Sequence, residues 1–321
     1  MKDNWGQTRS ALLGLTPIIF ALLVAGCATR TPGPDAFAFG VVGDTPYSEA
    51  EEREWLTLIE RVNAEPLAFT IHVGDFNGGD RCSDELFALR RKQFDSFAQP
   101  LIYTPGDNEW TDCRRPHMGS MDPLERLARL RQVFFTDGYS LGARRIATEA
   151  QDQCLAPPVA GCGCSAYPEN RSWEHRGVRF VTLNAPGSNN NVGFDMASDA
   201  EALCRNAANA RWLDRATEAA GAPGVRALVI AIQADPWLPK RPVFAGLIAQ
   251  VEAVSRKLGK PVLFVHGDTH TYRVDFPFNA PVTRLETFGS PIVGWVKVIV
   301  DPADPQPFRF EPHAVAIVPP K

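Results

Sequence analysis

Four hydrophobic runs in this sequence end in the dipeptide Gly-Asp, which places an acidic residue directly after each run. The runs are FAFGVVGD, AFTIHVGD, PLIYTPGD and PVLFVHGD, and their acids are Asp44, Asp75, Asp107 and Asp268. Short apolar runs rich in β-branched residues that stop at a glycine are typical of buried strands. Ligands of α/β sheets bind outside the carboxyl ends of the strands. We therefore expect the four carboxylates to meet at one edge.

Carboxylates gathered without counter-ions repel one another and take up protons, whereas two divalent cations would cancel the charge of four. A single Gly-Asp after a strand is more simply turn chemistry or a helix cap. Four copies, one of them followed two residues later by His270, favour a common site. The pattern predicts a two-metal hydrolytic centre.

The segments between these runs read as helices and connect the strands in an α/β order. A capping box of Ser48 and Glu51 precedes an amphipathic stretch over 49–63. Other predicted helices begin after Ser83 and at Asp122-Pro123, and further ones cover 199–220 and 241–258. After residue 268 the runs TRLETFG, GWVKVIVD and FRFEPHAV follow without helices, so the strands are expected to finish antiparallel.

Residues 37–321 are predicted to form a single domain, because a chain of this length can bury a full core. The segment 138–175 reads as a loop-rich, Cys-containing insertion. It is either a lid beside the site or a disulfide-stapled surface loop without a role.

The N-terminal 26 residues have the layout of a secretory signal, with Lys2 and Arg9 before an apolar run at 11–26. The run ends in VAGC, which is similar to a bacterial lipobox and makes Cys27 the expected lipidated residue; a simple signal with an incidental cysteine is the alternative. Ala28, by the same resemblance, favours the periplasmic side of the outer membrane. Residues 27–36 read as a flexible tether.

Six further cysteines in an exported chain suggest disulfides. Cys82 and Cys113 follow the second and third Gly-Asp runs, so both are expected at the same rim and are predicted to pair. The other four, Cys154, Cys162, Cys164 and Cys204, allow three pairings. The formal net charge of −4 gives no support for nucleic-acid binding.

The order of these blocks resembles the calcineurin-like metallophosphoesterases, which include the purple acid phosphatases. GDTPY, GDFNGG, GDNEW, IQADPW and HGDTH stand in the places of the family's five motifs, over roughly residues 37–275. The resemblance implies a two-sheet β-sandwich core flanked by helices. It also implies that Asp75 bridges two cations, and it divides the other metal ligands into two sets: Asp44 and His270 for one ion, and Asp107, Gln233 and Asp268 for the other.

The chain departs from the family where the family has histidines. Gln233, Asp268 and Pro46 replace imidazoles, and the purple-phosphatase tyrosine is Gly78. Oxygen ligands suit Mg or Mn better than Zn, with Fe or Zn as further possibilities. A buried amide that bonds to a loop is an equal interpretation of Gln233.

The family's acid histidine is Asn108 here, which can hold a phosphoryl oxygen through its amide but cannot donate a proton as an acid. Glu109 and His266 are the neighbouring candidates for that role if burial raises a pKa. Two other groups, the turn PGSNNN at 186–191 and the arginines Arg114, Arg115 and Arg273, are candidates for anion contacts.

We therefore expect an exported, lipid-anchored, metal-dependent phosphoester hydrolase in the cell envelope. The alternative is a catalytically impaired binding lipoprotein with the same scaffold. The negative net charge of the chain disfavours a nuclease. The sequence gives no prediction of an oligomeric state.

Overall fold

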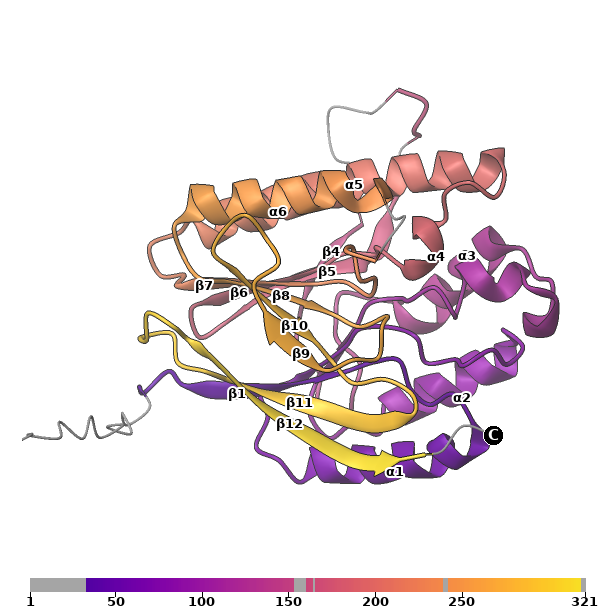
Figure 1. Cartoon of the computed structure of the whole chain (residues 1–321), viewed down its shortest axis with the longest axis horizontal. Helices are drawn as coiled ribbons and strands as arrows, with labels where there is room; N and C mark the ends of the chain where they lie inside the picture. Colours follow the sequence, from indigo (N-terminus) through magenta and orange to yellow (C-terminus); the bar gives the residue numbers. More distant parts are fainter. Residues whose placement is uncertain (1–32, 153–159, 164, 239–241, 319–321) are drawn as a thin grey trace, which may run out of the picture. The chain divides into compact units, whose positions relative to one another are not determined.

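The computed structural model describes residues 33–152, 160–163, 165–238 and 242–318. Over these residues the chain forms two mixed β-sheets flanked by helices (Figure 1), which confirms the predicted architecture. The predicted signal peptide, Cys27 and most of the tether lie outside the described residues. Among the helices that the structure describes, none has the length and apolar character needed to cross a membrane.

The five-stranded sheet has the order β12-β11-β1-β2-β3. Its strands are β1 (Phe37–Val42), β2 (Thr70–His72), β3 (Leu101–Tyr103), β11 (Ile292–Val300) and β12 (Phe308–Ile317). Strands β1, β2 and β3 are parallel, β11 is antiparallel to β1, and β12 is antiparallel to β11. The first three Gly-Asp dipeptides therefore leave the same edge of this sheet.

The seven-stranded sheet has the order β4-β5-β6-β7-β8-β10-β9. Its strands are β4 (Glu149–Gln151), β5 (Tyr167–His175), β6 (Val178–Thr182), β7 (Ala227–Ala231), β8 (Val262–His266), β9 (Arg273–Asp275) and β10 (Val282–Glu286). The expectation of antiparallel strands after residue 268 holds for β9, β11 and β12 but is wrong for β10, which is parallel to β8. The chain passes first to the sheet edge as β9, and β10 then fills the place beside β8.

Strand β5 corrects the interpretation of the end of 138–175 as loop, because this nine-residue strand pairs with both β4 and β6. The polar residues of β5, which give it no hydrophobic pattern in the sequence, are buried and form ion pairs or hydrogen bonds. Glu169 pairs with Arg131 at 2.6 Å, and the Asn170 amide lies 2.7 Å from the Gln151 side-chain oxygen. A strand whose buried side chains are polar gives no alternating hydrophobic pattern. The proposed lid role of this segment stays a prediction.

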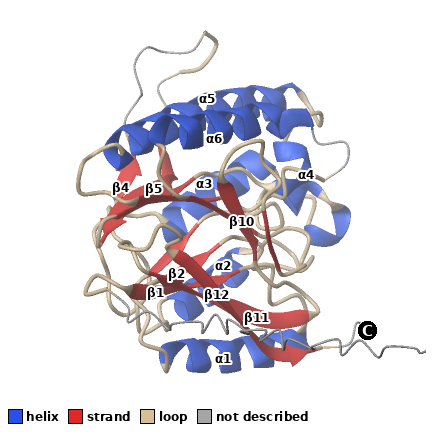
Figure 2. Cartoon of the chain, turned by 60° about the vertical axis from the view of Figure 1, so that its left-hand side comes forward, coloured by secondary structure: helices blue, strands red, loops and turns tan. Residues whose placement is uncertain are grey.

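The main helices lie in two layers, one on the outer face of each sheet (Figures 1 and 2). Helices α1 (Glu49–Asn63), α2 (Asp84–Phe94) and α3 (Pro123–Phe134) cover the five-stranded sheet, and α5 (Met196–Ala220) and α6 (Ala245–Leu258) cover the seven-stranded sheet. Ser48, Ser83 and Asp122 cap the first three helices, as predicted. The short helices are α4 (Gly187–Asn190), η1 (Thr111–Arg114), η2 (Pro116–Met118) and η3 (Pro242–Phe244).

Three apolar layers hold this arrangement together. Phe39, Phe180 and Leu263 belong to the layer between the two sheets. Trp212 and Trp55 belong to the layers between each sheet and its helices. All five side chains are at most 1% exposed, so the core fixes the strand ends from which the candidate site is built.

Two disulfides lie in the described residues. Cys82 and Cys113 are bonded with their Cα atoms 5.7 Å apart, which confirms the predicted pair. Cys162 is bonded to Cys204, which selects among the pairings that the sequence left open. Cys154 and Cys164 lie outside the described residues.

Candidate metal centre

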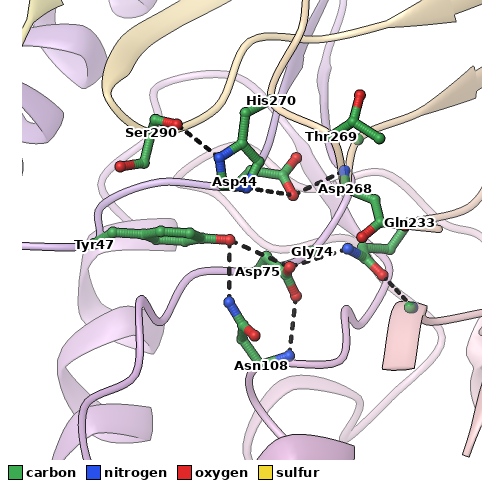
Figure 3. A network of polar contacts seen from close by, with 12 residues as sticks. Asp44, Tyr47, Gly74, Asp75, Asn108, Gln233, Asp268, Thr269, His270 and Ser290 are labelled. Atoms are coloured by element: carbon green, nitrogen blue, oxygen red, sulfur yellow. Dashed lines mark hydrogen bonds and ion pairs between the residues drawn. The ribbon is translucent and has the colours of Figure 1, made fainter. Parts of the chain in front are cut away.

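The predicted ligands from both sheets come together at the carboxyl ends of the strands (Figure 3). The backbone N–H of Asp268, after β8, donates to the Asp44 Oδ1 atom, after β1, at 2.9 Å. The Asp75 Oδ2 atom, after β2, accepts from the Gln233 amide, after β7, at 3.0 Å. These two hydrogen bonds join the sheets across the site, so Asp44 and Asp268 lie on the same side, as expected.

Asp75 lies at the centre of the hydrogen-bond network. Its Oδ1 atom accepts from the Asn108 backbone N–H at 3.0 Å, and its Oδ2 atom accepts from the Tyr47 hydroxyl at 3.2 Å as well as from Gln233. The Asn108 side-chain amide donates to the same Tyr47 hydroxyl at 3.1 Å. Both oxygens of Asp75 therefore have neutral donors.

The carboxylates are buried and repel one another. Burial raises the pKa of Asp44 well above its ordinary value, and the nearby Asp268 and Asp107 carboxylates add to this. Burial also raises the pKa of Asp75, with Asp107, Glu109 and Asp44 as further causes. The Oδ2 atom of Asp44 and the Oδ1 atom of Asp107 are buried without a hydrogen-bond partner. Such unpartnered carboxylate oxygens are suited to a divalent cation.

Two glycines of the Gly-Asp pairs leave space for side chains of neighbouring loops. A Cβ atom on Gly106 would lie 2.0 Å from Asp75 Oδ1, and one on Gly267 would lie 2.0 Å from Asp44 Oδ2. Each glycine thus leaves room for a carboxylate from another strand end. The aspartates Asp44, Asp75 and Asp268 themselves have positive φ angles, of 51°, 56° and 80°.

His270 has the geometry of a metal-binding imidazole. Its Nδ1 atom lies 2.6 Å from the Ser290 carbonyl oxygen, which fixes the ring, and its Nε2 atom lies 3.8 Å from Asp44 Oδ1. A metal-ligating histidine usually donates its other ring N–H to a carbonyl or carboxylate. Asp44 and His270 therefore have ligand atoms close enough to share one divalent cation.

Gln233 and Asp268 are engaged in hydrogen bonds within the protein. The Gln233 side-chain oxygen accepts from the Gly187 backbone N–H at 2.6 Å, while its amide nitrogen donates to Asp75. Of the two interpretations of Gln233, these contacts favour the amide that bonds to a loop. The Asp268 Oδ2 atom accepts from the Asp235 backbone N–H at 2.8 Å. Among the predicted ligands of the second ion, Asp107 has the unpartnered oxygen.

The PGSNNN turn enters the site and contacts Asp107. The Ser188 hydroxyl lies 2.8 Å from Asp107 Oδ2 and 2.6 Å from Asp112 Oδ1. Residues 188–191 all have positive φ, which Asn tolerates better than most residues. Burial raises the pKa of Asp112 to about 6, and the Asp107 carboxylate adds to this. Sequence reasoning named the turn as a candidate but missed the contacts of Ser188 with Asp107 and Asp112, because they join segments distant in sequence.

The contacts of Glu109 and His266 do not support their prediction as proton donors. The Glu109 carboxylate is fully buried and accepts from the Gly106 N–H at 2.6 Å, the Tyr103 hydroxyl at 2.7 Å and the Asp75 N–H at 3.1 Å. It therefore holds two Gly-Asp loops together from within the protein. His266 is grouped with two other acids, Asp235 and Glu286.

The three candidate arginines are engaged within the protein. Arg273 lies 2.7 Å from a Glu286 oxygen, and Arg115, which is half-exposed, lies 2.8 Å from Asp112. Arg114 bonds to Asn191 and stacks on the Phe194 ring at 3.4 Å. Arg114 and Arg115 thus connect the η1 segment to the PGSNNN turn beside the site.

Comparison with known proteins gives matches at the level of structure. No family model and no curated protein sequence matches the chain. A dimetal phosphatase from Danio rerio is 12% identical over 87% of this chain and 96% of its own, with a TM-score of 0.54. The GAP50 anchor of the inner membrane complex of Plasmodium is 8% identical over 88% and 90%, with a TM-score of 0.49. A phosphopantetheinyl hydrolase from Mycobacterium tuberculosis is 15% identical over 79% and 90%, with a TM-score of 0.45.

The match to the Danio rerio protein covers nearly the whole of both chains, and at this identity it establishes the fold alone. The chain therefore shares the two-sheet α/β fold of the Danio rerio protein, with the strand ends of both sheets at one candidate centre.

Proposed function

We propose that the chain is a metal-dependent phosphoester hydrolase. The observation that carries the proposal is the group of buried carboxylates of Asp44, Asp75 and Asp107, which come from three adjacent parallel strands. Burial is the largest cause that raises the pKa of Asp44 and Asp75, and repulsion by neighbouring carboxylates adds to it. A group of this kind is suited to cations and to the phosphoryl oxygens that cations hold.

Asp44 and His270 would hold one cation, Asp107 would contribute to a second, and Asp75 would be shared between them. Mn or Mg is the preferred ion because oxygen ligands predominate. When bound, such ions would neutralise the phosphoryl oxygens and lower the pKa of an attacking water. The Asn108 amide, which donates to the Tyr47 hydroxyl in this structure, would donate a hydrogen bond to a phosphoryl oxygen.

Tyr47 is the residue that we propose in place of the missing acid histidine. Its hydroxyl lies 3.1 Å from the Asn108 amide nitrogen, beside the position that the resemblance assigns to that histidine. Burial and the carboxylates of Asp75 and Asp44 raise its pKa, so the hydroxyl keeps its proton near neutral pH. It can therefore donate to the leaving oxygen of a substrate.

The test is a panel of phosphomonoesters and phosphodiesters with Mn, Mg, Zn and Fe. We expect metal-dependent hydrolysis that Asp75→Asn abolishes, because the shared carboxylate is lost. Asp80→Asn, an exposed change five residues further along the same loop, is the matched control and should leave the rate unchanged. Tyr47→Phe should lower the rate for poor leaving groups more than for good ones.

A binding protein is the second candidate function, and the saturation of Asp75 favours it. Both Asp75 oxygens already accept hydrogen bonds from Asn108, Gln233 and Tyr47. A metal-loaded chain that binds phosphoesters without hydrolysing any of them would support this candidate over the hydrolase.

Export and lipid anchoring at Cys27 form part of the proposal. The disulfides Cys82–Cys113 and Cys162–Cys204 support it, because such bonds persist in oxidising compartments. We expect Cys27→Ser to release soluble protein or to block processing, as measured by membrane fractionation and mass spectrometry of the mature terminus. An unmodified terminus at another residue would contradict the lipid anchor.

A further inference from the structure

A second group of ligand-type side chains lies at the carboxyl ends of β7, β8 and β10. Asp235 follows β7, His266 is the last residue of β8, and Glu286 is the last residue of β10 and the register partner of His266. One ring nitrogen of His266 and one carboxylate oxygen from each acid lie within 4.8 Å of one another. Each of the three residues is at most 3% exposed.

The tautomer of His266 leaves a nitrogen lone pair without a partner. Its Nδ1 atom lies 2.8 Å from the Gly267 carbonyl oxygen, and only a protonated Nδ1 can bond to a carbonyl. The lone pair is therefore on Nε2, which is buried and has no hydrogen-bond partner. A fully buried acceptor that lacks a donor requires an explanation.

Two arginines account for part of the surrounding charge but not for the imidazole. Arg273 Nε lies 2.7 Å from Glu286 Oε2, and Arg284 pairs with Asp275 and lies 3.8 Å from Asp235. Three carboxylates thus face two guanidinium groups, which leaves an excess of negative charge. Neither arginine forms a hydrogen bond to the His266 ring.

We propose that Asp235, His266 and Glu286 form a buried binding site for one divalent transition-metal ion, with Zn²⁺ as the best fit. Imidazole and carboxylate groups are ordinary zinc ligands, and a ligating histidine typically bonds to a backbone carbonyl through its other nitrogen. This site is connected to the Asp44 centre through Asp268. The Asp268 N–H donates to Asp44, and its carboxylate accepts from the Asp235 N–H. The ion ties the ends of β8 and β10 to the loop after β7.

The site does not depend on the proposed hydrolase function, and its test measures binding alone. The background is Asp44→Asn/His270→Gln, which removes the imidazole of the first centre and one of its buried charges. The full chain in this background is stripped with a chelator and titrated with Zn²⁺ against a chromophoric competitor. We expect one equivalent of Zn²⁺ to bind, and X-ray absorption of the loaded protein to show imidazole at the zinc.

Adding His266→Gln to the background should weaken zinc binding by at least about 100-fold and remove the imidazole signal. Glu286→Gln is the second ligand variant, in case the first impairs folding as judged by circular dichroism. His313→Gln is the matched control, because His313 lies on β12 and stacks on Trp295, and it should leave binding unchanged. A folded background chain that binds no Zn²⁺, or binding that neither ligand variant weakens, would overturn the site.

Discussion

Tyr47 occupies the space that Gly78 leaves open. A Cβ atom on Gly78 would lie 2.3 Å from the Tyr47 Cβ atom and 2.4 Å from its Cα atom. The resemblance to purple acid phosphatases places a tyrosine at position 78. Here a tyrosine from the loop after β1 reaches Asp75 instead, with its hydroxyl 3.2 Å from the Oδ2 atom.

Gly78→Ala should therefore displace Tyr47. The added methyl meets the Cβ and Cα atoms of Tyr47, which cannot move as the far end of a side chain can, so we expect a loss of about 1–3 kcal/mol in unfolding free energy. The rate with poor leaving groups should fall as in Tyr47→Phe. Gly224→Ala is the control, because a Cβ atom there has no neighbour within 4 Å. Urea denaturation and the phosphoester panel give the two readouts, and equal effects of the two alanines would contradict this relationship.

Asn108→His tests whether the family's acid can be restored. In the hydrolase interpretation an imidazole could contribute roughly 10²–10⁴-fold for phosphoesters with poor leaving groups and little for good ones. The new ring also replaces the amide that donates to Tyr47, so the gain should persist in Asn108→His/Tyr47→Phe. Steady-state rates against a series of leaving groups measure it. A variant as inert as the parent would favour the binding protein.

Glu109→Gln should change how stability depends on pH. Burial raises the folded-state pKa of Glu109 from 4.5 to about 7, so the folded chain keeps a proton that the unfolded chain releases in this range. The contribution of Glu109 is therefore greatest below pH 4.5 and declines as the pH rises to 7. Relative to Glu109→Gln, the wild type should lose on the order of 1–3 kcal/mol across this window.

Urea denaturation in the presence of a chelator, at pH values from 4.5 to 8, measures the difference between wild type and Glu109→Gln. The comparison cancels the opposing effect of buried histidines such as His72, whose folded-state pKa is lowered. Glu60→Gln, an exposed change on α1, should run parallel to the wild type. A Glu109→Gln curve that is also parallel would show that Glu109 is ionised throughout.

The two disulfides should differ in their effect on the metal centre. Their sequence separations of 31 and 42 residues are similar, so Cys82→Ser/Cys113→Ser and Cys162→Ser/Cys204→Ser should each cost about 3–4 kcal/mol of stability. Only the first joins two Gly-Asp loops, and the Cys82 sulfur lies 3.6 Å from the Asn108 carbonyl oxygen. We expect only the first pair of substitutions to weaken Mn²⁺ binding, as measured by calorimetry. Equal affinities in both variants would contradict this.

The parts of the fold that depend on local signals could be predicted from the sequence. Ser48 and Ser83 cap helices where expected, and the Gly-Asp runs end strands that share one edge. Strand β5 could not be predicted, because its buried Glu169 and Asn170 are compensated by partners elsewhere in the chain. Such compensation is invisible to hydrophobic periodicity.

In the candidate site, the positions of the carboxylates could be predicted from the strand ends. The hydrogen-bond partners of the side chains could not be predicted and are known only from the structure. Gln233 bonds to Gly187, which lies 46 residues away, and His266 lies with Asp235 and Glu286 rather than with Asp75. His266 is the last residue of β8, whereas Asp268 lies beyond the strand with a positive φ of 80°, so nearness to Asp268 in the sequence was not a guide to the position of the His266 side chain.

Asp268 makes the two proposed metal sites thermodynamically dependent on each other. Its backbone N–H contacts Asp44 in one site, and its side chain contacts the Asp235 backbone in the other. A movement of Asp268 would therefore change the position of a ligand in both sites. If loading one site changes the affinity of the other by some factor, linkage requires the reverse effect to have the same factor. A zinc ion held by Asp235, His266 and Glu286 would then set the concentration of Mn²⁺ or Mg²⁺ at which the first site fills.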